Sequence, residues 1–536
     1  MMVRPLMGGR HYVFPGPTSC LQCLYEQMKI TDAFFLSSDR LFQSVYLVSE
    51  NPFLQGVTRC LASCSFFRGV SVDVASLVLK SAASVCKHSN AENKPAKKNE
   101  VKKSDRYRAQ DLRHFFAFCS PDLFVSQAHG TIGPSIDYDY ASLVTAKASG
   151  FFVIREHEEK YTRPWGGHCS NFSDAAKLGV LEGVERISGE SPARNKVYNS
   201  SPHGVPQIGL SDFGMAADDW RIPNPTVRSW VKGHLADTRA CDFVGEEVYL
   251  PERIAYYRPI IDRIPWVQES SNGCAIGGTL CEATLFGLLE VIERDAFLIA
   301  WYSKAELNPI DVTTIRSYET QCFLSRLKLC GTRVVLLDAT VGVNIPTIIA
   351  VCEEPGGSTC VGAGANPDPE RALFSALVEV ASDFQVVARR RRQRGEELEA
   401  MLDDFSKVRV MEDHADLFAN PHARPLIAHW MYPRKPMIDL HSLDCPDAAI
   451  GMSVQQDLDY VLQQCAVQGF NPLIVKLDHG LLHTLGAYCV KTIVPGLIPI
   501  DFGQYQRALH MPRLANRGRA LQDTDFAPYP VPHPFP

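Results

Sequence analysis

The sequence predicts a mixed α/β fold. From about residue 120 to the end, short apolar runs rich in β-branched residues alternate with segments in which apolar residues recur at three- and four-residue steps. Such repeated strand–helix units are typical of α/β domains, and no glycine-rich fingerprint of the P-loop type is present. With 536 residues and 46% hydrophobic content, the chain is long enough for a buried core and more than one domain.

The stretch 277–295 predicts a helix with an acidic face. Thr279 is followed three residues later by Glu282, which is the spacing of a capping box. Apolar residues at helical spacing form one stripe, at Leu285, Leu288, Leu289 and Ile292. The acidic residues of the same helix are Glu282, Glu290 and Glu293. At about 100° per residue, Glu282 and Glu293 lie within roughly 20° of each other around the helix.

A related pattern occurs upstream. The glycine pair at 166–167 precedes a Glu-x-x-Glu-Arg motif at 182–186, as the pair at 277–278 precedes the same motif at 290–294. A solvated acidic face with ion pairs within the helix would explain either helix alone. Two such helices facing each other would instead gather four or five carboxylates and two arginines, which suits Mg²⁺ bound together with a polyphosphate.

Further motifs extend this pattern along the chain. They are Ser270-Ser271-Asn272-Gly273, the run Gly362-Ala363-Gly364-Ala365 with Asp368-Pro369-Glu370 and Ala376-Leu377-Val378-Glu379 after it, and the C-terminal Pro532-His533-Pro534-Phe535-Pro536. Together with the two acidic helices, they resemble the YcaO family of ATP-dependent enzymes that modify peptide backbones. The proline-rich end resembles that of the azoline-forming branch, the cyclodehydratases of thiazole/oxazole-modified peptide pathways. The resemblance covers residues 120–536.

The resemblance implies an activity and a set of partners. The side chain of a Cys, Ser or Thr in a ribosomally made precursor peptide would attack the preceding carbonyl, ATP would phosphorylate the resulting oxyanion, and loss of phosphate would leave a thiazoline or oxazoline. The expected partners are the peptide, a leader-binding protein, a flavin-dependent azoline dehydrogenase and a second copy of the chain. A family member that forms thioamides or amidines is an alternative, and so is a non-catalytic docking scaffold.

The same resemblance implies the site residues. ATP and Mg²⁺ would be the cofactors, with the metal held by Glu182, Glu185, Glu282, Glu290 and Glu293. Arg294 would contact phosphate, and Glu379 is a further cofactor-binding candidate whose alternative is a solvated helix carboxylate. Pro536 is the catalytic candidate of the tail 528–536, where alternating prolines favour an extended arm that reaches toward the active site. The alternative for this tail is a frayed chain end.

Some positions depart from the family pattern. Gly278 stands where the family usually has asparagine, and His168 stands where a lysine is common. Near Glu379, Ser375 and Ser382 lie close to the places of an arginine and a glutamine. These departures favour either altered nucleotide affinity or the scaffold alternative. Cys274, Cys281 and His168 could suggest a Cys–His nucleophile, but the sequence shows no base that would fix a thiolate.

The N-terminal part is predicted to be separate. Residues 1–87 form a small domain in which Cys20 and Cys23 resemble a zinc-knuckle fragment of an adenylation-type partner fold, so the domain could be a remnant of that fold. Cys20 and Cys23 could bind zinc or could be buried structural thiols. The candidate second pair, Cys60 and Cys64, has three intervening residues instead of two, so it meets the spacing of a two-pair zinc site only in part. A helix is predicted over 72–85. The lysine-rich segment 88–107 is a solvated linker to the YcaO-type domain at 120–536.

Individual elements follow from local patterns. Strands are predicted at 151–154, 247–251, 332–337, 345–351, 473–478 and 490–495. A long helix is predicted over 370–389. The basic run 389–394 is interpreted as the exposed end of this helix, with contact to an acidic peptide as the alternative.

Composition excludes several classes of protein. A net charge of −6 with both signs interspersed gives no nucleic-acid or membrane signature. The 17 cysteines show no closely spaced framework, and there is no signal peptide and no apolar span of membrane length. These features predict a cytoplasmic protein with reduced thiols.

Overall fold

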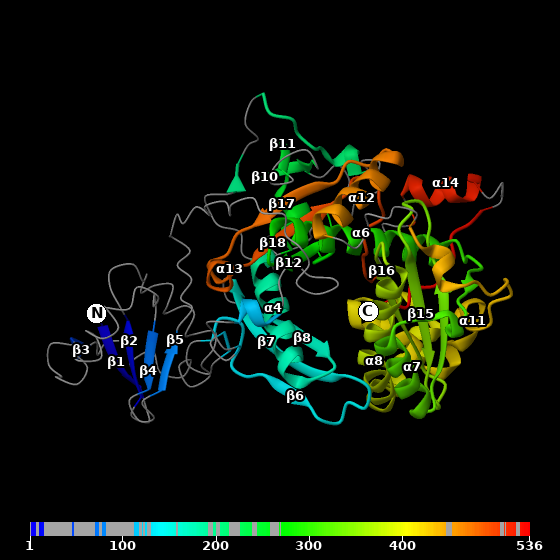
Figure 1. Ribbon diagram of the computed structural model, residues 1–536, viewed down its shortest axis with the longest axis horizontal. Helices are drawn as coiled ribbons and strands as arrows, with labels where there is room; N and C mark the ends of the chain where they lie inside the picture. Colours follow the sequence, from blue (N-terminus) through cyan, green and yellow to red (C-terminus); the bar gives the residue numbers. More distant parts are fainter. Residues whose placement is uncertain are drawn as a thin grey trace.

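A computed structural model describes five short strands within the first 111 residues and most of the chain from 112 to 535. In the latter part the description is interrupted at 117–120, 122–123, 126–129, 157–158, 191–196, 200–203, 214–225, 238–243, 258–266, 268–269, 446–452, 504–508, 510 and 521–525. Helices and sheets occur together throughout, which confirms the mixed α/β class (Figure 1).

The strands have the following bounds. The N-terminal ones are β1 (Met2–Leu6), β2 (Arg10–Phe14), β3 (Tyr46–Leu47), β4 (Val70–Asp73) and β5 (Val78–Ser81). The others are β6 (Asp137–Asp139), β7 (Ala146–Glu156), β8 (Glu159–Cys169), β9 (Val197–Tyr198), β10 (Trp230–Ala236), β11 (Val244–Pro251), β12 (Cys274–Gly277), β13 (Asn308–Pro309), β14 (Arg333–Asp338), β15 (Thr347–Glu353), β16 (Thr359–Ala365), β17 (Leu473–Leu477) and β18 (Tyr488–Ile493).

The helices that matter for the site are long. They are α4 (Phe172–Glu190), α6 (Leu280–Tyr302) and α8 (Pro369–Gln393). The other helices are α3 (Leu112–Phe115), α5 (Glu252–Ala255), α7 (Tyr318–Leu329), α9 (Gly395–Asp403), α10 (Met411–Ala419), α11 (Arg424–Met431), α12 (Val454–Val467), α13 (Gly480–Leu485) and α14 (Pro512–Ala520).

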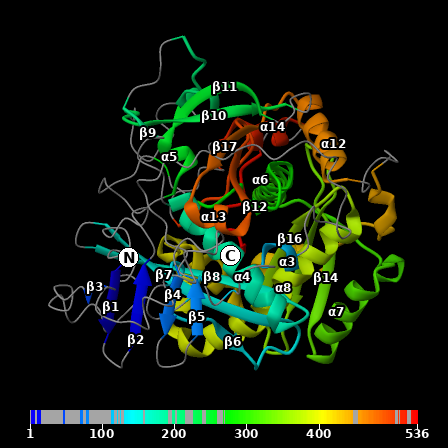
Figure 2. The ribbon, with the colours of Figure 1, turned by 60° about the vertical axis from the view of Figure 1, so that its left-hand side comes forward.

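Three antiparallel sheets carry the helices of the site. The first has the order β6-β7-β8, the second β11-β10-β17-β18-β12 with β9 beside β10, and the third β13-β14-β15-β16. Helix α4 packs on β7 and β8, α8 packs on β15 and β16, and α6 packs on β12 and β18 while also contacting β16. Figure 1 shows α4 and α8 on opposite sides of the centre with α6 above them, and Figure 2 shows the same three helices from another side.

The α4 and α8 units are built alike. In each, a hairpin precedes a helix that lies directly against a glycine of the second strand. A side chain at Gly167 would lie 2.0 Å from the Ala175 carbonyl oxygen, and one at Gly364 would lie 2.1 Å from the Ala372 carbonyl oxygen. The helix backbone therefore approaches the strand so closely that only glycine fits.

The correspondence between these two units extends to their glutamates. The Gly166 N–H donates to Glu182 Oε2 at 2.7 Å, and the Ala363 N–H donates to Glu379 Oε2 at 3.0 Å. Donor and acceptor are 16 residues apart in both units. By sequence motif, the counterpart of α4 is α6, because both carry Glu-x-x-Glu-Arg. By geometry, the counterpart of α4 is α8.

Helix α6 is the most deeply buried of the three. Its N-cap is Thr279, whose side chain accepts the Glu282 N–H at 3.1 Å, as the capping spacing predicts. The Glu282 carboxylate reaches back to the Gly278 N–H at 2.9 Å, one residue before the cap. The C-terminal turns of α6 are fully buried, with Phe297, Trp301 and Tyr302 at most 1% exposed.

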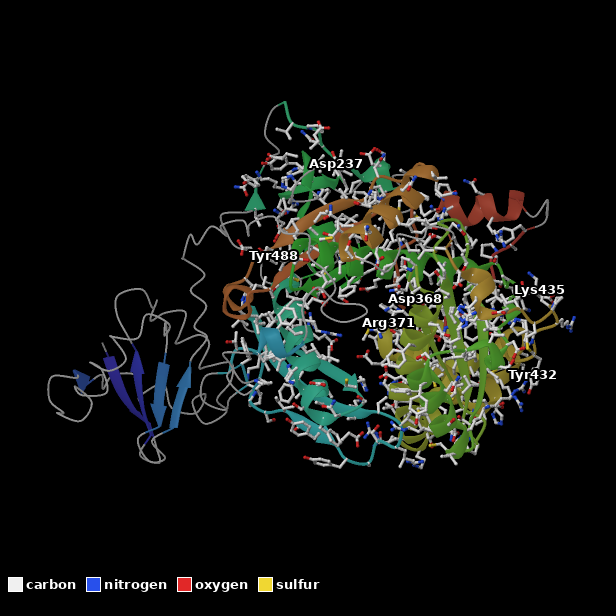
Figure 3. The ribbon with its side chains drawn as sticks, in the orientation of Figure 1. Asp237, Asp368, Arg371, Tyr432, Lys435 and Tyr488 are labelled. Atoms are coloured by element: carbon white, nitrogen blue, oxygen red, sulfur yellow. The ribbon has the colours of Figure 1, made fainter. Side chains whose placement is uncertain are left out.

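Most of the predicted elements are confirmed. The strands predicted at 151–154, 247–251, 332–337, 345–351, 473–478 and 490–495 all correspond to observed strands, and the helix predicted over 370–389 corresponds to α8. Figure 3 shows Asp368 and Arg371 at the beginning of α8, where the Asp368 side chain caps the helix by accepting the Glu370 N–H.

The helix predicted over 72–85 is wrong. The structure has two short antiparallel strands there, β4 and β5, with Val72 opposite Leu79. The alternation Val70-Ser71-Val72-Asp73 explains the difference, because β-branched residues at every second position favour a strand. Cys20 and Cys23, the zinc candidates, lie outside the described residues.

The basic run at 389–394 ends α8 and takes part in ion pairs. Arg390 lies 3.1 Å from Asp416, Arg391 lies 2.7 Å from Glu354, and Arg394 lies 3.0 Å from Asp413. These pairs connect α8 to α10 and to the turn between β15 and β16. The interpretation as a helix end is confirmed, and three of its arginines stabilise neighbouring elements.

The proline-rich tail is an ordered part of the core. The Tyr529 N–H donates to the Tyr302 carbonyl at 2.7 Å, and Trp301 Nε1 donates to the Val531 carbonyl at 2.8 Å. Val531 and Phe535 are 3% and 1% exposed. The alternative of a frayed end is therefore excluded for residues 529–535, while Pro536 lies outside the described residues.

Candidate active site

Carboxylates from α4 and α6 approach each other across the site. Glu185 of α4 and Glu290 of α6 are close enough to interact electrostatically. Burial, and then the charges of Glu290 and Glu182, raise the pKa of Glu185 well above its usual value. Burial also raises the pKa of Glu290, although Arg294 and Lys491 oppose the shift.

A second pair of carboxylates joins α6 to α8. Burial raises the pKa of Glu293 to about 8, and the charges of Glu379 and Glu290 contribute to the shift. The pKa of Glu379 is raised mainly by burial as well, with Glu290 and Asp383 adding to it. Helix α6 therefore carries the central carboxylates, α4 adds Glu185 next to Glu290, and α8 adds Glu379 next to Glu293.

Glu182 is already neutralised by its own helix. Arg186, one turn later, donates to Glu182 Oε1 from Nε at 2.9 Å and from Nη2 at 2.7 Å. The other oxygen of Glu182 accepts the Gly166 N–H. Such charge-assisted hydrogen bonds fix the carboxylate at the edge of β8.

Glu282 occupies a different position from the central group. It is fully buried at the first turn of α6, eight residues before Glu290, and the rise of an α-helix separates the two by about 12 Å along the axis. The Glu282 carboxylate points back to the Gly278 N–H, so in this structure Glu282 and Glu290 do not converge on one ion. The predicted ligands Glu182, Glu185, Glu290 and Glu293 lie toward the centre, and Glu282 lies apart from them.

The donor set fits divalent cations. Several half-buried carboxylates are held near one another with raised pKa values, so ionising them is costly without added positive charge. Hard oxygen donors of this kind suit Mg²⁺. Among the described residues, no three His, Cys, Asp or Glu side chains converge on one point, because the carboxylates turn toward backbone amides and arginines.

Arg294 is the cation at the centre of the group. Its Nε lies 3.8 Å from Glu293 Oε1 and 4.0 Å from Glu290 Oε1, distances that are too long for hydrogen bonds. Within the part of the chain that the structure describes, Nε and Nη1 are buried and have no hydrogen-bond partner. Unpartnered buried donors cost free energy, and a phosphate oxygen would satisfy them.

Lys491 is a site residue that the sequence did not reveal. It lies on β18 opposite Cys274, is 5% exposed, and its Nζ donates to the Ser270 carbonyl at 2.6 Å. Its charge acts on Glu185 and Glu290. The available signal was a single charged residue, a lysine between Val490 and Thr492, in a mostly apolar strand, since lysine is almost never fully buried unless it is paired.

The Cys–His alternative finds no support in this geometry. Burial raises the pKa of the Cys274 thiol to about 12, and burial likewise raises that of Cys281 above its usual value. Burial and the charge of Lys147 lower the pKa of His168 to about 4. Neither thiol is therefore activated as a thiolate.

Comparison with known proteins decides the family. A model of the family described as YcaO cyclodehydratase, ATP- and Mg²⁺-binding, matches residues 166–498, more than half of the chain. The chain belongs to the YcaO cyclodehydratase family. ATP and Mg²⁺ are thus the cofactors of this domain, as the motifs implied, and the match includes all three acidic helices.

Two relatives share part of the YcaO sequence. An uncharacterized protein of Methanothermobacter thermautotrophicus is 24% identical over 341 residues, which are 62% of this chain and 81% of that protein. An uncharacterized protein in the tfuA 3' region of Rhizobium leguminosarum bv. trifolii is 31% identical over 150 residues, which are 26% of this chain and 36% of that protein.

Solved structures share the YcaO fold. A heterocyclase in complex with substrate and cofactor superposes with a TM-score of 0.69 at 18% identity, over 99% of this chain and 77% of that one. The heterocyclase TruD gives 0.62 at 17% identity, over 98% and 73%. YcaO from Methanopyrus kandleri bound with AMPPCP and Mg²⁺ gives 0.54 at 20% identity, over 74% and 95%.

The half-buried glutamates Glu290 and Glu293 are expected to make the stability of the metal-free YcaO domain depend on pH. Their pKa values are raised in the folded state, so between the ordinary value of 4.5 and about 8 the folded protein holds protons that the unfolded chain has released. The free energy of unfolding is therefore expected to fall as the pH rises through this range, and Mg²⁺ with a nonhydrolysable ATP analogue should reduce the fall. Denaturant unfolding between pH 5 and pH 8, with and without metal, measures both effects.

The matched variant for this measurement is Glu293→Gln. It cannot release a proton, so its decline between pH 5 and pH 8 should be smaller than that of the wild type by at least about 1 kcal/mol. Burial lowers the pKa of His414 to about 4. The stabilisation that this neutral histidine contributes is therefore lost as the pH falls below 6.5, opposite in sign to the effect of the glutamates. This contribution is the same in the wild type and in the variant. Identical slopes for wild type and variant would show that Glu293 is not a half-buried carboxylate with a raised pKa.

Proposed function

We propose that this YcaO chain is an ATP-dependent cyclodehydratase that converts Cys, Ser or Thr of a ribosomally made precursor peptide into thiazolines or oxazolines. The observation that carries the proposal is that the carboxylates of the site and the C-terminal tail both lie at Arg294. The acidic group consists of Glu185 of α4, Glu290 and Glu293 of α6 and Glu379 of α8. Its α6 and α8 members interact with Arg294, and Phe535 of the docked tail lies against the same arginine. Arg294, the proposed phosphate-binding residue, is thus also the residue that the tail contacts, and a proline-rich tail of this kind is what the sequence shares with the azoline-forming branch.

The roles proposed for the side chains follow from their placement. Glu182, Glu185, Glu290 and Glu293 are the proposed central Mg²⁺ ligands, and Glu282, at the first turn of α6, is a proposed ligand that lies apart from them. Mg²⁺ supplies positive charge at the phosphates, where phosphoryl transfer needs it. Arg294 would donate its free N–H groups to phosphate, and Glu379 extends the acidic group on α8.

The proposed reaction balances in the following way. The thiol or hydroxyl of the substrate residue forms a bond to the preceding carbonyl carbon and loses its proton, and the carbonyl oxygen becomes an oxyanion. That oxygen then takes the γ-phosphoryl group and ADP leaves. Breaking the C–O bond releases phosphate, and loss of the N–H proton leaves a C=N bond in the ring. The protein's task is mainly positioning and charge stabilisation.

The tail favours azoline formation over the thioamide or amidine alternative. Residues 529–535 are hydrogen-bonded into the core along α6, and an arm of this kind belongs to the azoline-forming branch that the sequence resembles. Pro536 stays the proposed catalytic residue of this arm, although it lies outside the described residues.

Domains and partners are part of the proposal. Residues 1–87 are proposed as a small N-terminal domain, 88–107 as a linker and 120–536 as the YcaO domain. The proposed partners are the precursor peptide, a leader-binding protein, an azoline dehydrogenase that uses flavin, and a second copy of the chain. Within the described residues no helix is both long and apolar enough to cross a bilayer.

Mass spectrometry of a candidate peptide incubated with this chain, ATP, Mg²⁺ and a leader-binding partner tests the function. The expected product has lost one water per modified residue, with one ATP hydrolysed for each ring. Without the partner, we expect processing to be slow or absent, because only fragments of a partner-type fold are recognisable in residues 1–87. Replacement of oxygen by sulfur in the peptide would support the thioamide alternative, and unchanged peptide without ATP turnover would support the scaffold.

A further inference from the structure

Arg294 lies between the acidic group and the tail. Its guanidinium carbon is 3.7 Å from the centre of the Phe535 ring, so the ring covers one face of the guanidinium plane. A cation at this distance over an aromatic face is attracted by the ring's quadrupole, and the attraction grows as water is excluded. Only 14% of the Arg294 side chain and 1% of Phe535 are exposed, so the contact is largely dry.

Among the described residues, no hydrogen bond at Nε or Nη1 fixes the orientation of Arg294. The nearest carboxylate oxygens, on Glu290 and Glu293, are 4.0 and 3.8 Å from Nε. Nε and Nη1 have no hydrogen-bond partner among the described residues. Within the described part of the chain, the face contact with Phe535 is thus a short-range contact that sets the plane of the guanidinium group, and it leaves the Nε–H and Nη1–H groups available to a ligand.

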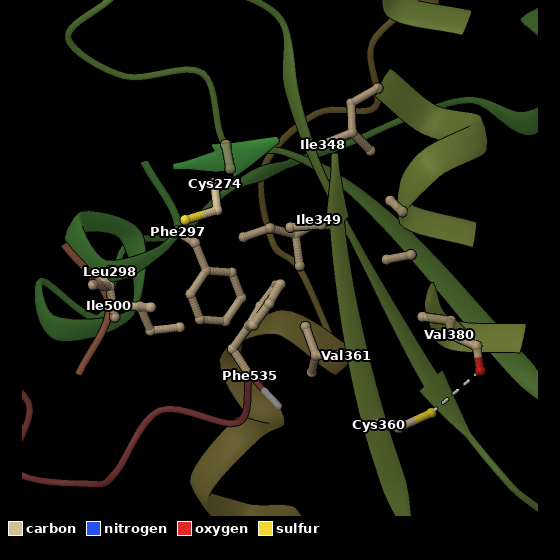
Figure 4. Close-up of a cluster of buried hydrophobic side chains, with 14 of the residues drawn as sticks. Cys274, Phe297, Leu298, Ile348, Ile349, Cys360, Val361, Val380, Ile500 and Phe535 are labelled. Atoms are coloured by element: carbon tan, nitrogen blue, oxygen red, sulfur yellow. Dashed lines mark hydrogen bonds between the residues drawn. The ribbon is translucent and has the colours of Figure 1, made fainter. Parts of the chain in front are cut away.

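Phe535 itself is held rigidly. Its ring packs edge to face on Phe297, one turn beyond Arg294 on α6, with centroids 4.8 Å apart. Figure 4 shows the two rings next to each other, with Val361 of β16 beside Phe535. Two residues earlier, His533 Nε2 donates to the Asp501 carbonyl at 2.9 Å, and His414 Nδ1 donates to the His533 carbonyl at 3.0 Å.

The two histidines are held as defined tautomers. His414 Nε2 accepts the Gly503 N–H at 2.9 Å, so its proton lies on Nδ1. The rings of His414 and His533 stack with centroids 4.2 Å apart. The tail backbone is thus hydrogen-bonded to the core at Tyr529, Val531 and His533, and these contacts position the Phe535 ring.

We propose that Phe535 is a positioning residue for Arg294. Its ring holds the guanidinium plane so that the free N–H groups of Arg294 remain at the acidic group and meet the transferring phosphoryl group without reorganisation. The inference rests on the proposed cyclodehydratase function, since it assigns the tail a task within that reaction. It differs from a role of Pro536, because it acts through the side chain of the preceding residue.

Fluorinated phenylalanines at position 535 test this proposal. Mono-, di- and trifluorinated rings have nearly the volume of phenylalanine, but their faces attract cations progressively less. We expect the kcat for ring formation to fall at each step, by about tenfold in all, with the KM for ATP changing less than threefold. The matched control is the same series at Phe418, which is 1% exposed and packs on Trp301 instead of a cation. Fluorination at Phe418 should leave kcat unchanged.

A second readout is independent of peptide processing. The Arg294 Nε–H resonance, assigned by its loss in Arg294→Lys, should lie upfield because of the ring current of Phe535, and should move to an ordinary position in Phe535→Leu. A resonance that does not move in Phe535→Leu overturns the inference. So does a kcat that is flat along the fluorinated series at 535. If the protein modifies no peptide, the proposed function is wrong, but the Arg294 Nε–H resonance still shows whether Phe535 lies over the guanidinium group.

Discussion

Replacing Glu290 or Glu293 by glutamine is expected to abolish ATP-dependent peptide processing without unfolding the protein. Each change removes one negative charge from the group that would hold Mg²⁺ and preserves side-chain volume. Loss of a metal ligand at a centre of phosphoryl transfer should lower kcat by about a thousandfold or more. Coupled assays of ADP release together with mass spectrometry of the peptide measure the loss.

The stability of these variants separates a lost ligand from a damaged fold. Because both glutamates have raised pKa values, the neutral amide should leave the metal-free protein as stable as the wild type at pH 8, or more stable. Glu319→Gln is a matched control, since Glu319 is exposed on α7 and should process peptide normally. Wild-type turnover in either α6 variant would remove both residues from the metal site.

Deleting residues 532–536 is expected to suppress ring formation far more than it weakens ATP binding. The deletion takes away the ring over Arg294, the His533 hydrogen bonds and the cover of Phe297. Misplacing a catalytic group by about 1 Å commonly costs about a hundredfold, so kcat should fall by at least that factor while the dissociation constant of an ATP analogue changes less than tenfold. Isothermal titration and single-turnover cyclisation measure the two quantities.

A tag placed after Pro536 should have a smaller effect of the same kind, and the same tag at the N-terminus serves as its control. Equal losses of ATP binding and of cyclisation in the deletion variant would argue that the tail supports the nucleotide site as a whole. Cyclisation at the wild-type rate would show that the tail has no part in the reaction.

Local patterns in this chain predicted its elements well. The capping pair Thr279 and Glu282 marked the start of α6, and apolar β-branched runs marked β7, β11, β14, β15, β17 and β18. These signals are local, since a cap or a strand period is read within a few residues. The error at 72–85 arose where a helical spacing and a strand alternation both fitted a short apolar stretch.

Long-range proximity was harder to predict. Lys491 lies beside Glu185 and Glu290 only because β18 pairs with β12, although more than 190 residues separate it from either glutamate. The same holds for Phe535, which reaches Arg294 from the far end of the chain. Nothing in the spacing of either residue indicates its partner, since strand pairing and tail docking are decided by the packed core.

The likeness of the α4 and α8 units has a consequence for the history of the site. Gly167, Ala175 and Glu182 have their counterparts at Gly364, Ala372 and Glu379, with one constant offset and the same contacts. Duplication of an ancestral hairpin–helix segment followed by divergence would leave this record. With the same offset, Ser382 and Asp383 stand where Glu185 and Arg186 stand in the other unit, so the two units share one backbone arrangement but differ in their chemistry.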